Sequence, residues 1–393
     1  MSVTRFISSK LDFSAGNGRM GRKSNAIARF SVSISFIVMI LSLAVVDGFK
    51  VEIRSKLTGF MGSALLTQPG ISPIDEQYFF SENLSYINAI DSLCGASSIR
   101  GAAYRSGLVK TDDQIEGLHF KGVEGWEGDI NDVKISASIS KKTGLKVGDK
   151  MTVYFIGDEV KVRRFTVSGI FDSQLDEIDN NFAFVDIRQI RRVNEWPEDA
   201  VSSLEIYFPQ EADMDEMTHM LTELVALRSS DSDAPLVVNS VKHFYPHLFD
   251  WLSLLDLNVM MILILMVAVA GFNMISAVLI ILFEKTSMIG LLKSIGMTTF
   301  QVGKVFLTYS ASLVGKGLVI GNVIGIALCL LQKHTHLIRL ESKNYFVDFV
   351  PISLDFWQIA ALDIAAFALI VLIVSLSTGF ISKVSPEKTL KAE

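Results

Sequence analysis

The chain has 393 residues and a net charge of −6, and hydrophobic residues make up 50% of it. The charge is uneven: residues 50–255 contain 20 Lys or Arg against 32 Asp or Glu, a balance of −12, whereas the rest of the chain is +6. So acidic a segment excludes nucleic acid as an expected partner. Cys94 is its only cysteine, which leaves no pair for an internal disulfide.

Four apolar segments are long enough to cross a bilayer, which takes roughly 20 residues of helix. Residues 30–46 and 257–283 contain no charged side chain, and the two later segments contain one each, Lys316 and Asp363. The sequence therefore predicts a membrane protein with spans at residues 30–49, 256–283, 305–331 and 356–382.

Basic residues in short segments predict the orientation of a membrane protein. Twelve Lys or Arg fall in segments 1–29, 284–304 and 383–393, whereas the loop 332–355 has three. We therefore expect both termini and the loop 284–304 in the cytosol. A secretory signal peptide is the alternative for the first span, but its 29-residue basic lead is long and no small-x-small cleavage site follows Val46.

The two charges inside the later spans are costly in lipid unless they pair or reach the interface. Lys316 and Asp363 are therefore expected either to form an ion pair or to leave Lys316 snorkelling toward the headgroups. Gly317, Gly321 and Gly325 recur at four-residue spacing, which permits close helix packing. Packing of spans three and four within the chain is favoured over a dimer seam.

The expected fold class is a four-helix membrane protein with a large extracytoplasmic α+β domain, residues 50–255, between helices one and two. Residues 150–155 and 160–170 alternate apolar and polar side chains around Gly157-Asp158, which predicts a β-hairpin. Residues 137–143, followed by a glycine, predict a short helix. Residues 213–227 predict an amphipathic helix with Met217, Met220, Leu221 and Leu224 on one face.

Catalytic and metal-binding signatures are missing from the sequence. Gly315-Lys316-Gly317 lacks the first glycine and the final hydroxyl of a phosphate-binding loop. His243 and His247 have a proline between them and no third Cys or His nearby. The acidic residues of segment 172–179 lack the glycine-centred spacing of a calcium loop and are expected in a solvated turn. The sequence therefore predicts no enzyme, no cofactor and no metal.

The loop 284–304 contains a short apolar pattern in a charged setting. Three- and four-residue spacing places its apolar side chains in one stripe of a helix, with the charged residues mostly off it. Such a stripe needs a partner surface. Its members are Met288, Leu291, Leu292 and Ile295.

Several stretches together resemble a known family. Residues 284–286 (Glu-Lys-Thr) and 289–296 (Ile-Gly-Leu-Leu-Lys-Ser-Ile-Gly) carry the most specific likeness, and residues 5–10, 45–49, 56–59, 167–171 and 179–185 add to it. This pattern resembles the four-span permease subunits of ABC transporters of the MacB, FtsX and LolC/LolE kind, and is closest to the LolC/LolE-like lipoprotein-releasing permeases of the inner membrane.

The resemblance implies a MacB-like periplasmic domain and a coupling helix that rests on a separate cytosolic ATPase dimer. ATP would be bound and hydrolysed there, and this chain would transmit force. The implied contact residues are Glu284, Lys285, Thr286, Ile289, Leu291, Leu292 and Ile295.

For LolC/LolE-like members the resemblance also implies a second permease subunit, identical or paralogous, and a lipoprotein cargo whose acyl chains lie among spans one and two. MacB-type efflux and FtsX-like signalling are the alternatives. Residues 156–159 are too short for the chaperone-recruiting hook of LolC, and Asp47 stands where asparagine is common. The implied groove residues are Met39, Val46, Met261 and Met266.

Overall fold

The computed structural model describes residues 19–72, 74, 78–95, 99–110, 115–157, 159–209, 212–230, 233–284, 286–341 and 345–377. The chain divides into two compact units. We call them the helical unit (Met1–Val51, Trp251–Arg339 and Phe349–Glu393) and the α+β unit (Glu52–Asp250 and Leu340–Asp348). The α+β unit thus includes Leu340–Asp348, which lies within the short outer loop expected from the sequence.

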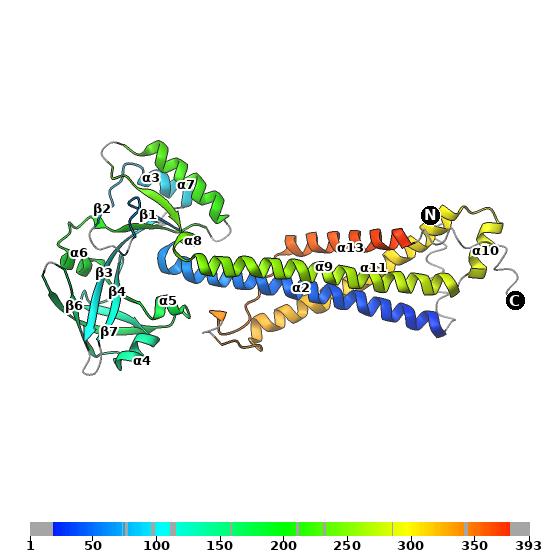
Figure 1. Ribbon diagram of the computed structural model, residues 1–393, viewed down its shortest axis with the longest axis horizontal. Helices are drawn as coiled ribbons and strands as arrows, with labels where there is room; N and C mark the ends of the chain where they lie inside the picture. Colours follow the sequence, from blue (N-terminus) through cyan, green and yellow to red (C-terminus); the bar gives the residue numbers. More distant parts are fainter. Residues whose placement is uncertain are drawn as a thin grey trace. The chain divides into compact units, whose positions relative to one another are not determined.

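The described residues form long helices, which Figure 1 shows as extended ribbons. These helices contain four segments that are apolar enough to cross a membrane, as the sequence predicts. Three of these segments are 36 to 38 residues long and the last has 21. At about 1.5 Å per residue the first three exceed the roughly 30 Å of a hydrocarbon core, so they continue beyond it. The helices are α2 (Arg19–Met61), α9 (Pro246–Glu284), α11 (Thr299–Thr335) and α13 (Phe356–Ser377), with the short α10 (Thr286–Ser294) between α9 and α11.

One apolar core joins these five helices. Phe36 of α2, Met274 of α9, Phe306 of α11 and Ile370 of α13 are all buried in it, and so is Ile289 of the short α10. The core of the helical unit therefore extends to the segment that connects α9 and α11.

The α+β unit is built on a nine-stranded mixed sheet, in the order β11-β1-β10-β3-β4-β8-β5-β7-β6. Strand β6 also pairs with β3, so the last six strands of that order close into a ring. The strands are β1 (Ala64–Thr67), β3 (Ile99–Lys110), β4 (Ile115–Val123), β5 (Asp132–Ser136), β6 (Lys150–Phe155), β7 (Lys161–Phe171), β8 (Phe182–Asp186), β10 (Ser203–Ile206) and β11 (Val237–Ser240); β2 (Phe80–Ser81) and β9 (Ala200–Val201) form a separate pair.

Aromatic side chains fill the core of this ring. The rings of Phe120 and Phe155 lie 5.3 Å apart, and those of Phe120 and Phe165 lie 5.9 Å apart. All three are fully buried. The helices of the unit are α3 (Ile87–Cys94), α4 (Ala137–Thr143), α5 (Asp176–Asp179), α6 (Ile187–Asn194), α7 (Met214–Arg228) and α8 (Val241–Phe244).

The hairpin and both helices predicted from local patterns are confirmed. Strands β6 and β7 pair antiparallel, α4 ends at a left-handed Gly144, and the carboxylate of Asp213 caps the start of α7. One detail was wrong: Met220 is exposed, and the buried residues of α7 are Met214, Leu221 and Val225. The face was misjudged because Met220 lies at the edge of the apolar arc.

Cys94 on α3 is a free, buried thiol. Burial raises its pKa to about 11, and the carboxylate of Asp91 adds to the shift. The thiol is therefore protonated and poorly nucleophilic at neutral pH.

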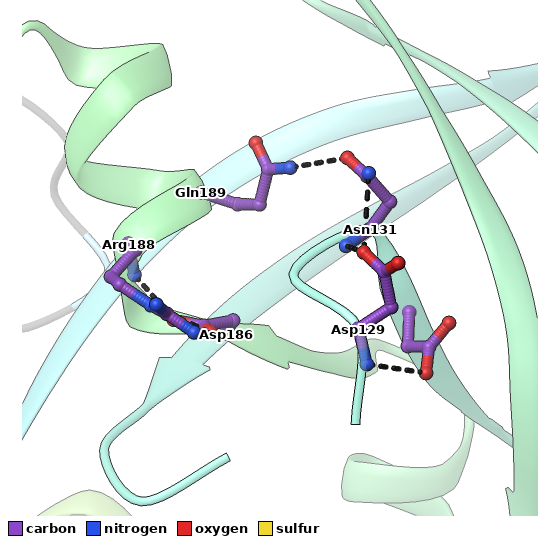
Figure 2. A network of polar contacts seen from close by, with 6 residues as sticks. Asp129, Asn131, Asp186, Arg188 and Gln189 are labelled. Atoms are coloured by element: carbon purple, nitrogen blue, oxygen red, sulfur yellow. Dashed lines mark hydrogen bonds and ion pairs between the residues drawn. The ribbon is translucent and has the colours of Figure 1, made fainter. Parts of the chain in front are cut away.

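A polar network attaches the loop before β5 to the first turn of α6 (Figure 2). Asp186 caps α6 by accepting from the backbone N–H of Arg188 at 2.8 Å, and Gln189 donates to Asn131 at 2.7 Å. Asn131 in turn donates through its backbone N–H to Asp129 at 3.0 Å. Asp186 and Gln189 are buried, so their bonds fix the position of α6 against the ring.

A buried ion pair lies where α2 ends in the α+β unit. The Lys121 ammonium is 2.6 Å from the Glu205 carboxylate, with side-chain exposures of 1% and 2%. It also donates to the backbone carbonyl of Phe60 in the last turn of α2. Tyr104 and Tyr207 both donate to Glu205, at 3.2 and 3.0 Å. Burial lowers the pKa of Lys121, and the adjacent Glu205 opposes that shift.

Removing the lysine should destabilise the α+β unit strongly. We expect Lys121→Met to lower the free energy of unfolding by about 3–5 kcal/mol, because Glu205 would stay buried without its counter-charge. Adding Glu205→Gln should recover much of this loss by removing the isolated charge. Urea unfolding, followed by the near-ultraviolet signal of the buried tyrosines, measures the change.

The control is Lys242→Met, since Lys242 and Asp215 form a pair of the same 2.6 Å length with side-chain exposures of 37% and 73%. An exposed pair contributes about 1 kcal/mol or less. Equal losses in Lys121→Met and Lys242→Met would contradict the role given to burial.

Candidate functional site

The short helix α10 and the turn that follows it each present one apolar side chain to the outside. Leu291 and Ile295 are 61% and 74% exposed, whereas Ile289 is fully buried in the core of the helical unit. Met288 and Leu292 pack partly against the same core. The stripe predicted from the sequence is thus divided: one edge holds α10 to the long helices, and the other edge is open.

The remaining residues expected at this contact lie at the join of α9 and α10. Thr286 donates its hydroxyl to the carbonyls of Leu282 and Phe283 at 3.2 and 2.5 Å, so it closes the end of α9. Glu284 is the last residue of α9, and its side chain lies outside the described part of the chain, as does Lys285.

The glycine series of α11 packs against α2. A Cβ at Gly321 would lie 2.7 Å from the Cβ of Phe36, and one at Gly317 would lie 2.7 Å from a methyl of Val32. The Ser33 hydroxyl donates to the carbonyl of Gly317 at 3.0 Å. The expectation of packing within the chain was right, but the partner is span one, not span four.

The two charges predicted within the spans have different surroundings. The Asp363 carboxylate of α13 accepts a hydrogen bond from the Asn322 amide of α11. The partner of Asp363 is therefore Asn322, where the sequence suggested Lys316. Lys316 is exposed on α11 and makes no pair with Asp363.

The four candidate acyl-groove residues do not share one surface. Met39 is fully buried in the core of the helical unit, so its own subunit occupies the place expected for cargo. Val46 and Met266 are half-buried. Met261 is 59% exposed on α9. Helical periodicity could not separate these cases, because apolar residues surround each span on every side.

A second polar contact in the α+β unit involves residues that the sequence did not single out as a site. The Lys56 ammonium, near the end of α2, donates to the carbonyl of Phe346 at 2.8 Å and to the side chain of Gln174. Gln174 in turn donates to Asp348. This contact fixes segment Leu340–Asp348 to the end of α2.

Two of these residues have unusual backbone conformations. Gln174 and Phe346 have φ values of 61° and 60°, a left-handed conformation that costs non-glycine residues free energy. Asp179 supports the Gln174 turn by accepting from the backbone N–H groups of Ser173 and Gln174, both at 3.0 Å. The expected turn is present, but Asp179 is buried and not solvated.

Within the described residues, no group of three or more His, Cys, Asp or Glu side chains is placed to hold a metal ion. His243 lies on α8 and His247 in the first turn of α9.

Filling the glycine cradle should loosen the helical unit. We expect Gly321→Ala to destabilise the detergent-purified protein by about 1–3 kcal/mol, because the new methyl group would overlap Phe36 and the backbone of Ser33. Thermal unfolding measures the change. Gly315→Ala on the same helix is the control, since no described heavy atom beyond its own turns of helix backbone lies within 4 Å of the added group. A Gly321→Ala protein as stable as the control would refute close packing there.

Comparisons with known proteins agree with this architecture. The family model of the MacB-like periplasmic core domain matches residues 26–224, and that of the FtsX-like permease C-terminal domain matches residues 260–386. The chain is 23% identical over 397 residues to the lipoprotein-releasing system transmembrane protein LolC of Neisseria meningitidis serogroup B, covering 94% of this chain and 93% of that protein.

A second relative is the lipoprotein-releasing system transmembrane protein LolE of Haemophilus influenzae, 21% identical over 402 residues and covering 93% of this chain and 94% of LolE. Among solved structures, the chain is similar to the periplasmic region of MacB from Actinobacillus actinomycetemcomitans, with 13% identity, a TM-score of 0.32, and coverage of 48% of this chain and 94% of that one.

Proposed function

We propose that this chain, which belongs to the family of ABC transporter permeases with a MacB-like periplasmic core domain and an FtsX-like permease domain, extracts lipoproteins from the inner membrane. Relatives that match over almost the whole chain, named as transmembrane proteins of lipoprotein-releasing systems, support this cargo. The permease acts with a second permease subunit, identical or paralogous. The chain itself is not an enzyme.

The exposed pair formed by Leu291 of α10 and Ile295 of the following turn is the observation that carries the proposal. In our assignment α10 and both termini face the cytosol, where a separate ATPase dimer binds Leu291 and Ile295. Apolar side chains this exposed, at the tip of a helix connection, are typical of a docking surface. Ile289 and Thr286 hold α10 in place from behind and are not themselves contact residues.

Force then travels along packed elements. Ile289 fixes α10 in the core shared by the long helices, so a displacement of α10 moves those helices with it. Helix α2 runs without interruption from Arg19 to Met61, with residues in both units. Its last turn is bonded to Lys121, which gives ATP-driven motion a direct path into the α+β unit.

Charges on the exposed pair should separate the ATPase from the permease. We expect Leu291→Asp with Ile295→Asp to abolish co-purification of the ATPase and its stimulation, because each carboxylate would have to be desolvated at an apolar contact. Membrane insertion should be unchanged. A pull-down of the ATPase together with its turnover rate measures the effect.

The control is Leu227→Asp, which changes a side chain that is 84% exposed in the α+β unit and should leave the complex intact. A complex that survives the double substitution with full stimulation of the ATPase would rule out α10 as the docking element.

For the cargo, the outward face of α9 is the best candidate surface. Met260, Met261, Ile264 and Leu265 are each more than half exposed on it. Methionine is flexible and polarizable, so it adapts to lipid tails. We therefore place acyl chains against Met261 and against the partly open Val46 of α2, and exclude Met39.

Polarity on that face should affect release without affecting ATP turnover. We expect Met261→Gln or Val46→Gln to impair lipoprotein release in membranes reconstituted with the ATPase, because an amide in contact with acyl chains is poorly solvated. Val323→Gln, at a position 65% exposed on α11, is the matched control and should release normally. Unchanged release together with altered export of a soluble small molecule would favour MacB-type efflux.

A further inference from the structure

Helices α11 and α13 are joined by a polar pair in apolar surroundings. The amide nitrogen of Asn322 on α11 donates to Oδ2 of Asp363 on α13. Both helices are long and apolar enough to cross a membrane. Since α13 runs from Phe356 to Ser377, Asp363 lies roughly 10 Å or more along the helix axis from either end.

Two acceptor oxygens of this pair are left over. Asp363 Oδ1 and Asn322 Oδ1 are both buried, and neither has a hydrogen-bond partner among the described residues. An ionised carboxylate only accepts hydrogen bonds, and so does an amide oxygen. An ionised Asp363 would therefore leave two buried acceptors without a donor, which costs free energy at both oxygens.

The apolar segments of the four long helices offer no counter-charge for an ionised Asp363. Lys, Arg, His and Glu are all missing from residues 30–46, 257–283, 317–332 and 356–377, and Asp363 is their one Asp. Their other titratable side chain is Cys329, which is buried beside Ile40 and Ala44. The nearest basic residue along α11 is Lys316, roughly 9 Å from Asn322 along the helix axis. An isolated carboxylate is costly in such surroundings.

We propose that Asp363 binds one proton and is a neutral carboxylic acid at neutral pH. The proton, taken from water, binds Oδ1 of Asp363, and this hydroxyl then donates to Oδ1 of Asn322. One proton thus satisfies both remaining oxygens, and the acid and the amide are joined by two parallel hydrogen bonds. The proton-binding site thereby holds α13 to α11.

Infrared spectroscopy of the full chain, purified in a detergent without ester groups, tests the proposal directly. In the difference between the unaltered protein and Asp363→Asn at neutral pH, we expect the C=O stretching band of a protonated carboxylic acid. Asn322→Leu should shift this band to higher wavenumber, because the acid loses its hydrogen-bonding partner. Val323→Leu changes an exposed neighbour and should leave the band in place. A difference spectrum without the band would overturn the proposal.

Thermal unfolding in the same detergent measures the proton through its linkage to stability. An aspartate in the unfolded chain is ionised above about pH 5. A folded chain that keeps one proton there loses stability as the pH rises from about 5 to 7, and its unfolding equilibrium constant increases about tenfold per pH unit. In Asp363→Asn the amide donates and accepts without titrating, so this loss should be absent.

The melting temperature of the unaltered protein should therefore fall relative to that of Asp363→Asn by about 3 °C per pH unit. Histidines and other groups titrate in both proteins and cancel in the difference. A difference that does not change with pH would contradict the bound proton. So would stabilisation by Na⁺ that Asp363→Asn lacks, because it would reveal an ionised carboxylate that holds a cation.

Discussion

The way α2 ends is the constraint on which the rest of the fold depends. A helix leaves its last carbonyl groups without intrahelical donors, and in a buried setting these must be satisfied by other groups. Gly62 adopts a φ of 78° and donates its N–H to Thr58 at 2.8 Å, which closes one carbonyl. The Lys121 ammonium satisfies the carbonyl of Phe60 by donating a hydrogen bond to it. A cation at this position also complements the negative end of the helix dipole.

The strands that carry the ion pair explain why it organises the sheet. Lys121 belongs to β4, inside the closed ring, and Glu205 belongs to β10, in the flanking strands. Strand β3 lies between them and contributes Tyr104, which pairs with Lys121 in register and donates to Glu205. The end of one long helix is thereby bonded across three neighbouring strands, so a movement of α2 acts on the ring and its flank together.

Local features of this fold could be predicted from the sequence. Which side chains and helices contact one another across the fold could not. The β6–β7 hairpin and helix α4 follow from residues close in sequence, and α7 begins where Asp213 provides a cap. The glycine series was recognisable as a packing seam, but its spacing fits any neighbouring helix. Met39 shows the same limit. The sequence does not distinguish an apolar side chain that faces lipid from one that faces cargo or the core of its own subunit. The sequence did not single out Lys121 or Glu205, since nothing local records a partner that is distant in sequence.

The positions of the charged residues along α2 and α11 bear on where the membrane boundary is expected. The two helices are parallel, because Val32, Phe36 and Ile40 meet Gly317, Gly321 and Gly325 in the same order. From Lys316 to the end of α11 at Thr335 the rise is about 28 Å, close to the roughly 30 Å of hydrocarbon. From Arg29 to Lys50 on α2 it is about 31 Å. Two packed helices thus place Arg29 and Lys316 at matching levels, and we therefore expect Lys316 at the edge of span three and not in its interior. Asp363, bonded to Asn322, lies within the expected span 356–382.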